Sequence, residues 1–439
     1  MILQALNDYY RRKQADSEPI NRLPAFGLEE KEIPFILEID AEGRLINLTD
    51  TRSGEGKKKI GQRFLVPQGV KKTSGVAANL LWDTAEYVLG LDMRGKPERV
   101  AEQQAAFHTR IEALPEAAQG DAGIQAVLAF LDAPAMERLE TMAAWPDILA
   151  ANPVMSFRLH GDLELVCQRP AVVASTATTG GDEKPNGICL VSGKVAAIER
   201  LHPAIKGVWG AQTSGANIVS FNLDAFNSYG KNQGANAPLG KPAAFAYTTA
   251  LNHLLARDSR QRMQVGDTST VFWAEEAHEL ENLFGEVMRD DPDRGADALR
   301  ALYSAVQSGK FAVGSTQTRF HVLGLAPNAA RIAIRFWETA TALELAKRIQ
   351  RHFDDIAIAH ADYEPEHLSL FRLLTGIALL NKADNIPPNL GGEIMRAILE
   401  DRPYPVPLLN LAVQRCRAEQ KPTYARAAAI KACLNRLNR

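Results

Sequence analysis

The sequence predicts an α+β protein in which a mixed N-terminal domain, residues 1–360, precedes an all-α, basic region, residues 361–439. Two observations lead to this prediction. Up to residue 337, short apolar runs bounded by turn-forming residues alternate with segments of helical spacing, which indicates short antiparallel strands and hairpins among helices. Beyond residue 365 only the helical spacing remains. The length of 439 residues and the hydrophobic content of 46% are sufficient for two or three globular domains.

The first elements are a helix and a hairpin. Residues 2–12 have helical spacing without a breaker, so a helix is expected there. Residues 35–39 and 44–48 are apolar runs joined by the turn-forming residues 40–43, which predicts a β-hairpin. From residue 97 to about residue 151 the sequence is rich in Ala, Glu and Leu, and helices are expected throughout.

Residues 76–89 are predicted to form an amphipathic helix whose N-cap is Thr73 or Ser74. Lys71 and Lys72 directly precede this predicted helix start. Free backbone N–H groups and the positive end of the helix dipole favour an anion at such a position. The pattern therefore predicts either a phosphate-binding site or an ordinary N-cap flanked by two surface lysines.

Further elements follow in the middle of the chain. The sequence predicts hairpins over 154–166 and 188–198, a helix over 242–256, and strands over 262–265 and 270–273. A later hairpin is expected over residues 320–337, where alternation places Ile332, Ile334 and Phe336 on one face. A helix near residues 339–354 is expected to place one apolar stripe on its buried side, formed by Ala342, Ala346, Ile349 and Phe353.

The net charge of −2 conceals strong segregation of charge. Residues 52–72 hold seven basic residues and one acidic residue, and residues 402–439 hold eight and one. Two basic blocks on an otherwise acidic chain predict local contact with a polyanion, although each is also compatible with a solvated face or tail. Basic residues recur at helix-like intervals near the C-terminus and can either follow a phosphate backbone or pair with acids elsewhere in the protein. They are Arg396, Arg415, Arg417, Lys421, Arg426, Lys431 and Arg436.

Residues 210–238 form the most unusual stretch of the chain. Eleven of these 29 residues are Asn, Gln, Ser or Thr, four are Gly, and only Asp224 and Lys231 are charged. Short amides and hydroxyls beside glycines can present hydrogen-bond donors and acceptors to another polar polymer at close range. The same composition is typical of an ordered loop whose side chains satisfy one another through local turns. Composition alone leaves both interpretations open.

No sequence motif of an enzyme is found. The chain lacks a Walker loop, a dinucleotide-binding glycine motif, a nucleophile elbow and a zinc-protease motif. Four scattered cysteines form no C-x-x-C pair, so neither a disulfide framework nor a metal site is expected, and a reducing cytoplasm fits. The apolar runs are too short to cross a bilayer, and the first ten residues do not look like a signal peptide. We expect a cytoplasmic protein without a cofactor.

The acidic residues 275–297 provide the alternative function, a metal-dependent nuclease or hydrolase. This segment holds nine acidic and two basic residues, and Glu275, Glu276, His278, Glu279 and Glu281 resemble a metal cluster in composition. Carboxylate nuclease sites, however, take their ligands from separate strands and helices. A solvated helix face is therefore the favoured interpretation of this run.

Several stretches together carry a resemblance to one known family. They are residues 1–10, 72–79 running into 86–90, 204–222, 226–236, 331–337, and 389–398 with 403–405. In order, and over nearly the whole chain, they resemble the large subunit of the type I-C CRISPR surveillance complex (Cascade), of the CRISPR-associated Csd family. Members usually continue into a C-terminal helical bundle, which we expect to be absent from these 439 residues.

The resemblance implies a non-enzymatic subunit of an RNA-guided antiviral ribonucleoprotein. Such a subunit lies near the 5′ handle of the guide CRISPR RNA, recognises the protospacer-adjacent motif in double-stranded target DNA, and helps to open the duplex into an R-loop. Its implied partners are the handle-binding, backbone and small subunits and a separately recruited helicase-nuclease. Sequence beyond the motif is read by pairing between guide and target.

With this resemblance, the polar stretches are expected to bind DNA. We expect phosphate or minor-groove contacts from Lys71, Lys72, Thr73, Ser74 and Asn79. The groups expected to read or wedge the motif duplex are Gln212, Thr213, Ser214, Asn217, Ser220 and Asn222, with Asn232, Gln233 and Asn236 on the same surface. Minor-groove acceptors require donors, which Lys, Asn and Gln supply.

Overall fold

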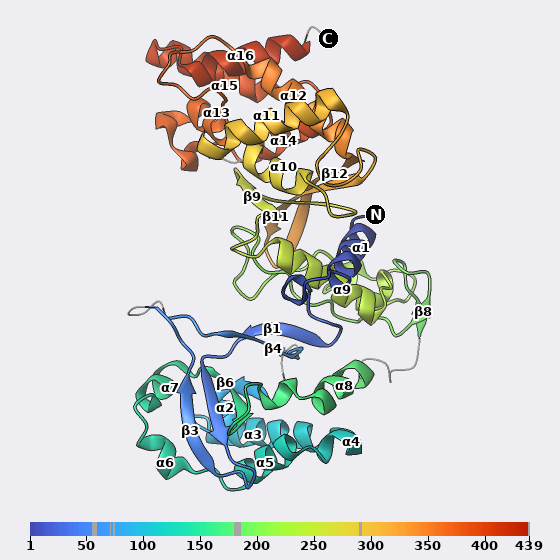
Figure 1. Ribbon diagram of the computed structural model, residues 1–439, viewed down its shortest axis with the longest axis vertical. Coiled ribbons are helices and arrows are strands. Elements are labelled where there is room, and N and C mark those ends of the chain that lie inside the picture. Colours follow the sequence, from blue (N-terminus) through green and yellow to red (C-terminus); the bar gives the residue numbers. More distant parts are fainter. Residues whose placement is uncertain (55–58, 71, 73–74, 180–185, 289–291, 438–439) are drawn as a thin grey trace. The chain divides into compact units, whose positions relative to one another are not determined.

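The computed structural model describes residues 1–54, 59–70, 72, 75–179, 186–288 and 292–437 (Figure 1). The chain forms two compact units. Unit 1 consists of Met1–Leu23 and Gly187–Arg439, and unit 2 consists of Pro24–Asn186. Both units combine strands and helices, which confirms the predicted α+β class. The expected division at residue 360 falls within unit 1 and stays a prediction.

Unit 2 is built on a four-stranded mixed sheet with the strand order β3-β2-β6-β5. Its strands are β2 (Phe35–Ile39), β3 (Leu45–Asp50), β5 (Trp82–Thr84) and β6 (Val154–Leu159). β2 pairs antiparallel with β3, which confirms the first predicted hairpin, and parallel with β6. A separate antiparallel ribbon pairs β1 (Leu28–Glu32) with β4 (Arg63–Pro67).

The helices of unit 2 lie mainly between β5 and β6 in the sequence, which confirms the helical prediction for residues 97–151. They are α2 (Ala85–Leu89), α3 (Pro97–Glu112), α4 (Glu116–Gln119), α5 (Ala122–Asp132), α6 (Met136–Glu140), α7 (Trp145–Ala151) and, after β6, α8 (Pro170–Thr179). Phe107 of α3 and Phe130 of α5 pack against Phe157 of β6, with ring centroids 6.4 Å and 5.7 Å apart. The unit therefore has a hydrophobic core of its own.

The predicted helix over residues 76–89 is wrong in its first half. Trp82–Thr84 instead pairs as strand β5 with β6, and the helix begins only at Ala85. The carboxylate of Asp83 accepts hydrogen bonds from the backbone N–H groups of Asn79 and Thr84, at 2.9 Å and 2.8 Å. Such local side-chain bonds to the backbone compete with helix formation, and pairing with β6 adds a second alternative.

The second strand of the hairpin predicted over residues 154–166 is also wrong. β6 forms as expected, but both of its edges are occupied, by β2 on one side and β5 on the other. No edge remains for residues 163–166. They lead into a 3-10 turn, Val166–Gln168, where the Gln168 side chain accepts a hydrogen bond from the Leu165 N–H at 2.8 Å.

Unit 1 is organised around an antiparallel sheet with the order β12-β11-β10-β9. Its strands are β9 (Arg262–Val265), β10 (Thr268–Ala274), β11 (Arg319–Asn328) and β12 (Arg331–Thr341), at the positions predicted from the sequence. α1 (Ile2–Gln14) and α9 (Lys241–Leu254), both predicted as helices, cover one face of this sheet (Figure 1). A small hairpin, β7 (Gly187–Ile188) and β8 (Val195–Ala196), precedes α9 in the sequence and is shorter than expected.

The other face of this sheet is covered by the C-terminal helices (Figure 1). They are α10 (Leu280–Met288), α11 (Pro292–Ser308), α12 (Ala342–Ile356), α13 (Leu370–Ile377), α14 (Leu390–Leu399), α15 (Val406–Glu419) and α16 (Tyr424–Leu437). Of these, α10, α12 and α14 pack directly on the strands, and the others complete the layer by packing mainly on these helices and on one another. Because both faces are covered, every residue of β10 is buried, with Val271 and Trp273 on one side and Phe272 and Ala274 on the other. The helical character predicted beyond residue 365 is confirmed.

The predicted apolar stripe of α12 is confirmed, because all four of its residues are buried. Thr341 and Glu344 form a capping box at its start. The face predicted for β12 is wrong. The register of β12 against β11 shifts between Gly324 and Leu325, so no residue of β11 lies opposite Arg335. This bulge reverses the alternation: Ile332 and Phe336 belong to opposite core clusters, and Ile334 is 43% exposed.

Candidate nucleic-acid interface

The amide-rich stretch of residues 210–238 lies in unit 1 and is attached to the sheet at its start. Ile205 and Ala216 exchange backbone hydrogen bonds of 2.8 Å and 2.9 Å, which closes a loop over residues 206–215. The backbone N–H of Trp209 donates to Ser269 Oγ of β10 at 2.9 Å. Gly210, with φ of 74°, lies so close to Pro327 of β11 that an added Cβ would be 3.3 Å from its ring. The loop is therefore seated against the strands.

Arg331, at the start of β12, anchors the next part of the stretch. Its guanidinium donates to the side-chain oxygen of Asn222 at 2.6 Å and lies 4.2 Å from the ring centre of Phe226. The Ile332 N–H donates to the carbonyl of Asn217 at 3.0 Å. The Asn217 amide in turn donates to the carbonyls of His202 and Pro203, each at 3.0 Å. The β11–β12 hairpin tip and this segment thus form one polar surface.

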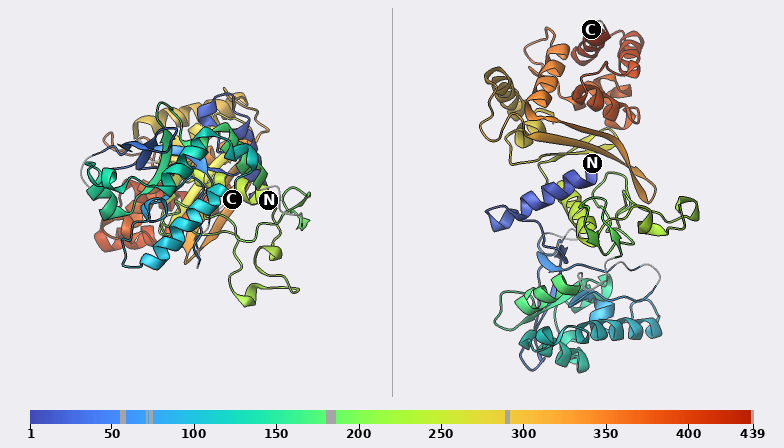
Figure 2. Two further views of the ribbon diagram at one scale, coloured as in Figure 1. Left: turned by 90° about the horizontal axis from the view of Figure 1, so that it is seen from below. Right: turned by 90° about the vertical axis from the view of Figure 1, so that its right-hand side faces the viewer.

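The far end of the stretch is a tight turn over residues 228–231. The Lys231 N–H donates to the Ser228 carbonyl at 3.0 Å, and both central residues, Tyr229 and Gly230, have positive φ, as in a type I′ turn. Asn236 accepts from the Ser228 N–H at 3.0 Å and donates to backbone carbonyls behind the turn. In Figure 2 the yellow-green segment that carries this turn stands out from the rest of unit 1.

The structure separates the predicted site residues of this stretch into two groups. Four of them hold the loop together: Asn217, Asn222, Gln233 (which accepts from Arg200 at 2.9 Å) and Asn236. Another four are exposed: Gln212, Thr213, Ser214 and Asn232, while Ser220 is half-buried. Both interpretations of the composition therefore apply, and Asn222 fits both, because it is exposed and also bonded to Arg331.

The predicted site residues of unit 2 divide differently. Lys71, Thr73 and Ser74 lie outside the described residues. Lys72 Nζ forms an ion pair with the buried carboxylate of Asp83 at 2.6 Å and lies 3.7 Å from the ring centre of Tyr87. The buried Asn79 accepts from the Val70 N–H at 2.9 Å. The helix expected to start beside these residues begins only at Ala85. The described residues next to Lys72 therefore offer no helix N-terminus that could bind an anion.

Three further candidate functional residues were not predicted from the sequence: Arg331, Trp209 and Tyr229. Trp209 is 65% exposed and Tyr229 is 97% exposed, although aromatic side chains usually bury much of their surface. A signal was present in the sequence, because both aromatics lie within or beside a run of small polar residues that has no helical or strand period. For Arg331 no such signal exists, since its partner Asn222 is distant in sequence.

Most of the basic row near the C-terminus is used inside the protein. Arg426 and Arg436 are buried and pair with Glu419 and Asp355, at 2.6 Å and 2.8 Å. Arg396 and Arg415 pair with acids one turn away, and Lys431 donates to the Ala357 carbonyl. Arg417 and Lys421 are exposed. The row therefore contributes mainly to packing of the helical layer.

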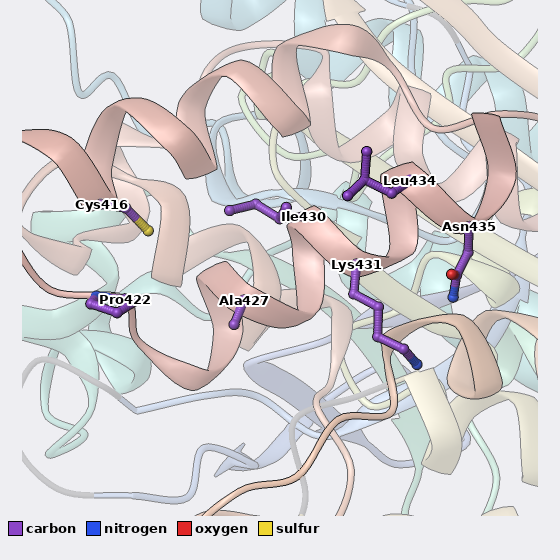
Figure 3. Close-up of a pocket in the computed structure, with 7 residues that line it drawn as sticks. All are labelled: Cys416, Pro422, Ala427, Ile430, Lys431, Leu434 and Asn435. Atoms are coloured by element: carbon purple, nitrogen blue, oxygen red, sulfur yellow. The ribbon is translucent and has the colours of Figure 1, made fainter. Parts of the chain in front are cut away.

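A hollow of about 390 Å³ lies between α15 and α16, lined by residues that include Cys416, Ile430, Lys431 and Leu434 (Figure 3). Its lining is mainly apolar, and the one charged lining side chain, Lys431, is hydrogen-bonded to the end of α12. The hollow thus presents no convergent polar groups that would fix a ligand.

Several side chains of the acidic segment bind other parts of the protein. Glu281 of α10 pairs with Arg12 at 2.8 Å and accepts from the Ala274 N–H at 2.9 Å. Glu279 accepts from the Ala312 N–H at 2.6 Å, and the ring of His278 is hydrogen-bonded to the Ser315 carbonyl at 3.1 Å. Over the described ranges, no group of three His, Cys, Asp or Glu side chains is arranged to hold a metal ion.

Within the same ranges, every helix is too short or too polar to span a bilayer. The fold and this surface define a two-unit α+β protein with an exposed, amide-rich loop held by an arginine. Residues 6–439 match the family model of the CRISPR-associated proteins Cas_Csd1. The chain belongs to this family, which confirms the resemblance noted in its sequence and makes the protein a CRISPR-associated Cascade subunit. A search of curated proteins found no match.

Proposed function

We propose that this protein is the large subunit of a type I-C CRISPR surveillance complex and recognises the protospacer-adjacent motif in double-stranded DNA. In this role it aids duplex opening and R-loop formation, supports recruitment of the helicase-nuclease, and has no enzymatic activity of its own. The observation that carries the proposal is the exposed triplet Gln212-Thr213-Ser214, in a loop seated on the β-sheet of a Cas_Csd1 family member.

The chemistry of this triplet suits base edges in a DNA groove. A glutamine amide both donates and accepts hydrogen bonds, and the two hydroxyls do the same. Base pairs present acceptors in both grooves, and the minor groove distinguishes A·T from G·C through one additional donor. Gly210 and Gly215 stand on either side of the triplet with positive φ. An added Cβ would lie 3.3 Å from the Pro327 ring at Gly210 and 2.9 Å from the Ile205 carbonyl oxygen at Gly215, so the two glycines let the loop fit closely against the protein. This fit leaves the side chains of the triplet exposed to a ligand.

Charge near the loop supports the same assignment. Arg331, whose hydrogen-bond partner Asn222 is neutral, lies at the start of β12, and exposed Lys206 lies at the start of the loop. Cations beside a polar reading surface attract the phosphate backbone without distinguishing sequences. The guide RNA and the other Cascade subunits are the remaining partners in this proposal, for which exposed Arg417 and Lys421 provide further backbone contacts.

The test is binding of the assembled complex to a duplex with the motif and to one with a scrambled motif. Gln212→Ala and the double variant Thr213→Ala/Ser214→Ala should each reduce the preference for the motif about tenfold, the worth of one good base contact. Gln317→Ala, which changes another exposed glutamine of unit 1, is the matched control and should retain the preference. Unchanged affinity and preference in both loop variants would refute the site assignment.

The rival function, a metal-dependent nuclease, has its own test. It requires metal-dependent cleavage of DNA by the purified chain, and loss of that cleavage in Glu276→Ala, which changes an exposed residue of the acidic segment. Our proposal expects no cleavage by the chain alone. A scaffold without DNA contacts would instead assemble with guide RNA and show full motif preference in every loop variant.

A further inference from the structure

The turn over residues 228–231 presents one aromatic side chain to solvent. Tyr229 is 97% exposed and occupies a central position of the turn with φ of 52°. A non-glycine residue in this left-handed region costs about 1 to 2 kcal/mol. The chain therefore adopts an unfavourable backbone conformation at the residue that is the most exposed of the large hydrophobic side chains in the described ranges. Strain of this kind is a reason to look for a function.

Asn236 holds this turn in place. Its side-chain oxygen accepts from the Ser228 N–H at 3.0 Å, and its amide donates to the carbonyls of Lys231 and Gln233, each at 3.0 Å. Gln233 is in turn held by Arg200 at 2.9 Å. Three hydrogen bonds of one side chain thus determine the shape of the tip, so Tyr229 is presented by a formed turn.

The base of the segment is fixed as well. Arg331 binds Asn222 and lies over the Phe226 ring, only a few residues before the turn. The segment from residue 217 to residue 236, which we call the arm, is therefore anchored at its start on the β11–β12 hairpin and closed at its end by Asn236. An anchored arm with a shaped tip loses little conformational freedom on binding a ligand.

The surroundings of Tyr229 indicate the kind of ligand. Asn227, Ser228, Lys231 and Asn232 are all exposed, and an added Cβ at Gly230 would have no heavy atom within 4 Å among the described residues other than its chain neighbours. A protein interface would normally surround its aromatic anchor with further contacts that exclude water. A single ring between amides and one lysine instead suits a nucleobase, which offers a flat π-face for stacking and a phosphate for the cation.

We propose that the arm binds single-stranded nucleic acid by stacking an unpaired base on Tyr229, with the exposed Trp209 as a second stacking residue. The proposal rests on the proposed function and deepens it, because it names the substrate of this surface after the duplex opens. Stacking needs a base that is no longer paired within a duplex. It is tolerant of sequence, since every base has a π-face.

The experiment measures binding of the full chain to a fluorescein-labelled 15-nucleotide oligo-dT and to an abasic oligonucleotide of the same length. The abasic probe keeps the phosphates but lacks the bases. The parent chain should bind oligo-dT more tightly. Tyr229→Leu, which removes the ring but keeps an apolar side chain, should weaken oligo-dT binding about tenfold and leave abasic binding unchanged. Tyr229→Phe, which keeps the ring, should bind both probes as the parent does.

Tyr363→Leu is the matched control. Tyr363 is 87% exposed in the same unit, but Asp362 and Glu364 flank it, so its loss should change neither affinity. Asn236→Ala should weaken oligo-dT binding although Tyr229 is intact, because the turn loses its support. Unchanged melting temperatures establish that the variants are folded. Trp209→Leu should lower the oligo-dT affinity further in a Tyr229→Leu background.

Equal affinity of the parent chain for the two probes would overturn the proposal, as would equal loss of both affinities in Tyr229→Leu. Loss of a protein subunit from the Tyr229→Leu complex, with normal nucleic-acid binding, would overturn it in favour of a protein contact. Failure here is separable from failure of the proposed function. Motif preference is measured on duplex DNA with Gln212 variants, whereas stacking is measured on single strands with Tyr229 variants.

Discussion

Lys72 illustrates how a basic residue in a basic block can be committed to the protein's own structure. Its ammonium lies 2.6 Å from a carboxylate oxygen of Asp83, whose side chain is only 2% exposed. Asp83 also accepts the N–H groups of Asn79 and Thr84, so it organises the chain before α2. Removing the cation would leave a buried carboxylate without its counter-charge, which is costly.

We therefore predict that Lys72→Ala lowers the free energy of unfolding of unit 2. Because Lys72 is about one third exposed, we discount the full cost of an unpaired buried charge and expect about 1 to 2 kcal/mol. Urea denaturation measures this. Lys96→Ala, at an exposed lysine of the same unit, should change stability by less than about 0.5 kcal/mol. Unchanged stability in Lys72→Ala together with lost DNA binding would contradict this prediction and support the expected role of Lys72 as a contact residue.

His352 is a second residue whose environment determines its chemistry. It is completely buried in α12, and its Nδ1 is hydrogen-bonded to the Tyr404 hydroxyl at 2.6 Å. Burial, with the nearby positive charge of Arg436, lowers the pKa of His352 to about 3. Arg436 itself pairs with Asp355, so a protonated imidazole would add a second cation to a site whose acid is already paired.

The expected consequence is acid sensitivity. Since the pKa of His352 is lower in the folded chain than its ordinary value of about 6.5, the unfolded chain binds the additional proton as the pH falls. The contribution of neutral His352 to stability is complete above about pH 6.5 and is lost progressively toward pH 3. Between pH 7 and pH 4 the loss should be about 3 kcal/mol, at about 1.4 kcal/mol per pH unit.

Comparison of stability at pH 7 and pH 4 checks this prediction. His352→Gln should show a smaller decrease than the parent, because glutamine does not titrate. His360→Gln, at an exposed histidine, should behave as the parent does. An identical decrease in parent and His352→Gln would show that other groups cause the acid sensitivity of the protein.

Among the strands and helices, the β11–β12 hairpin connects the core to the candidate interface. Its register shift at Gly324 and Leu325 determines which side chains of β12 enter which core, and its tip carries Arg331. Gly324 lies opposite Phe336, and an added Cβ would be 2.3 Å from the ring. Glycine is required here because the Phe336 ring occupies the space of a side chain.

Gly324→Ala should therefore destabilise the protein by about 1 to 3 kcal/mol, the usual cost of overpacking a core. Urea denaturation measures the change. Gly120→Ala is the matched control, because the nearest atom to its added Cβ is 3.9 Å away and its φ of −71° suits any residue. If the two substitutions have equal effects, the close contact with Phe336 does not constrain the hairpin.

Across the full chain, the main feature is that unit 2 is inserted into unit 1 between Leu23 and Gly187. The core residues of unit 2, from Ile33 to Val172, all lie within residues 24–186, and the two core clusters of unit 1 lie outside that range. Each unit therefore buries its apolar side chains among its own elements, which is the condition for independent folding.

We predict that residues 24–186 expressed alone fold cooperatively. A single sigmoidal urea transition, followed by circular dichroism, is the expected result. As the complementary measurement, residues 1–23 joined to 187–439 by a short Gly/Ser linker should retain a transition of their own. A gradual, non-cooperative response of residues 24–186 would contradict the division into two units.

Much of the fold, and part of the candidate site, could be predicted from the sequence. Strong local patterns predicted α1, α9, α12 and the four strands of the unit 1 sheet, because periodicity and capping residues lie within each segment. The amide-rich stretch was recognisable for the same reason, as a run of small polar residues. Its exposed triplet, Gln212-Thr213-Ser214, belongs to that prediction.

Only the tertiary structure decided which of these polar groups are available. Asn217, Asn236 and Lys72 bind partners within the protein, whereas Arg331 becomes the anchor of the arm through a contact with Asn222 across 109 residues. Likewise, pairing of Trp82–Thr84 with β6 replaced the first half of a predicted helix. The sequence alone determined the local elements because their causes are local. Hydrogen-bond partners and strand neighbours depend on chain segments that meet only on folding, and these determined the site.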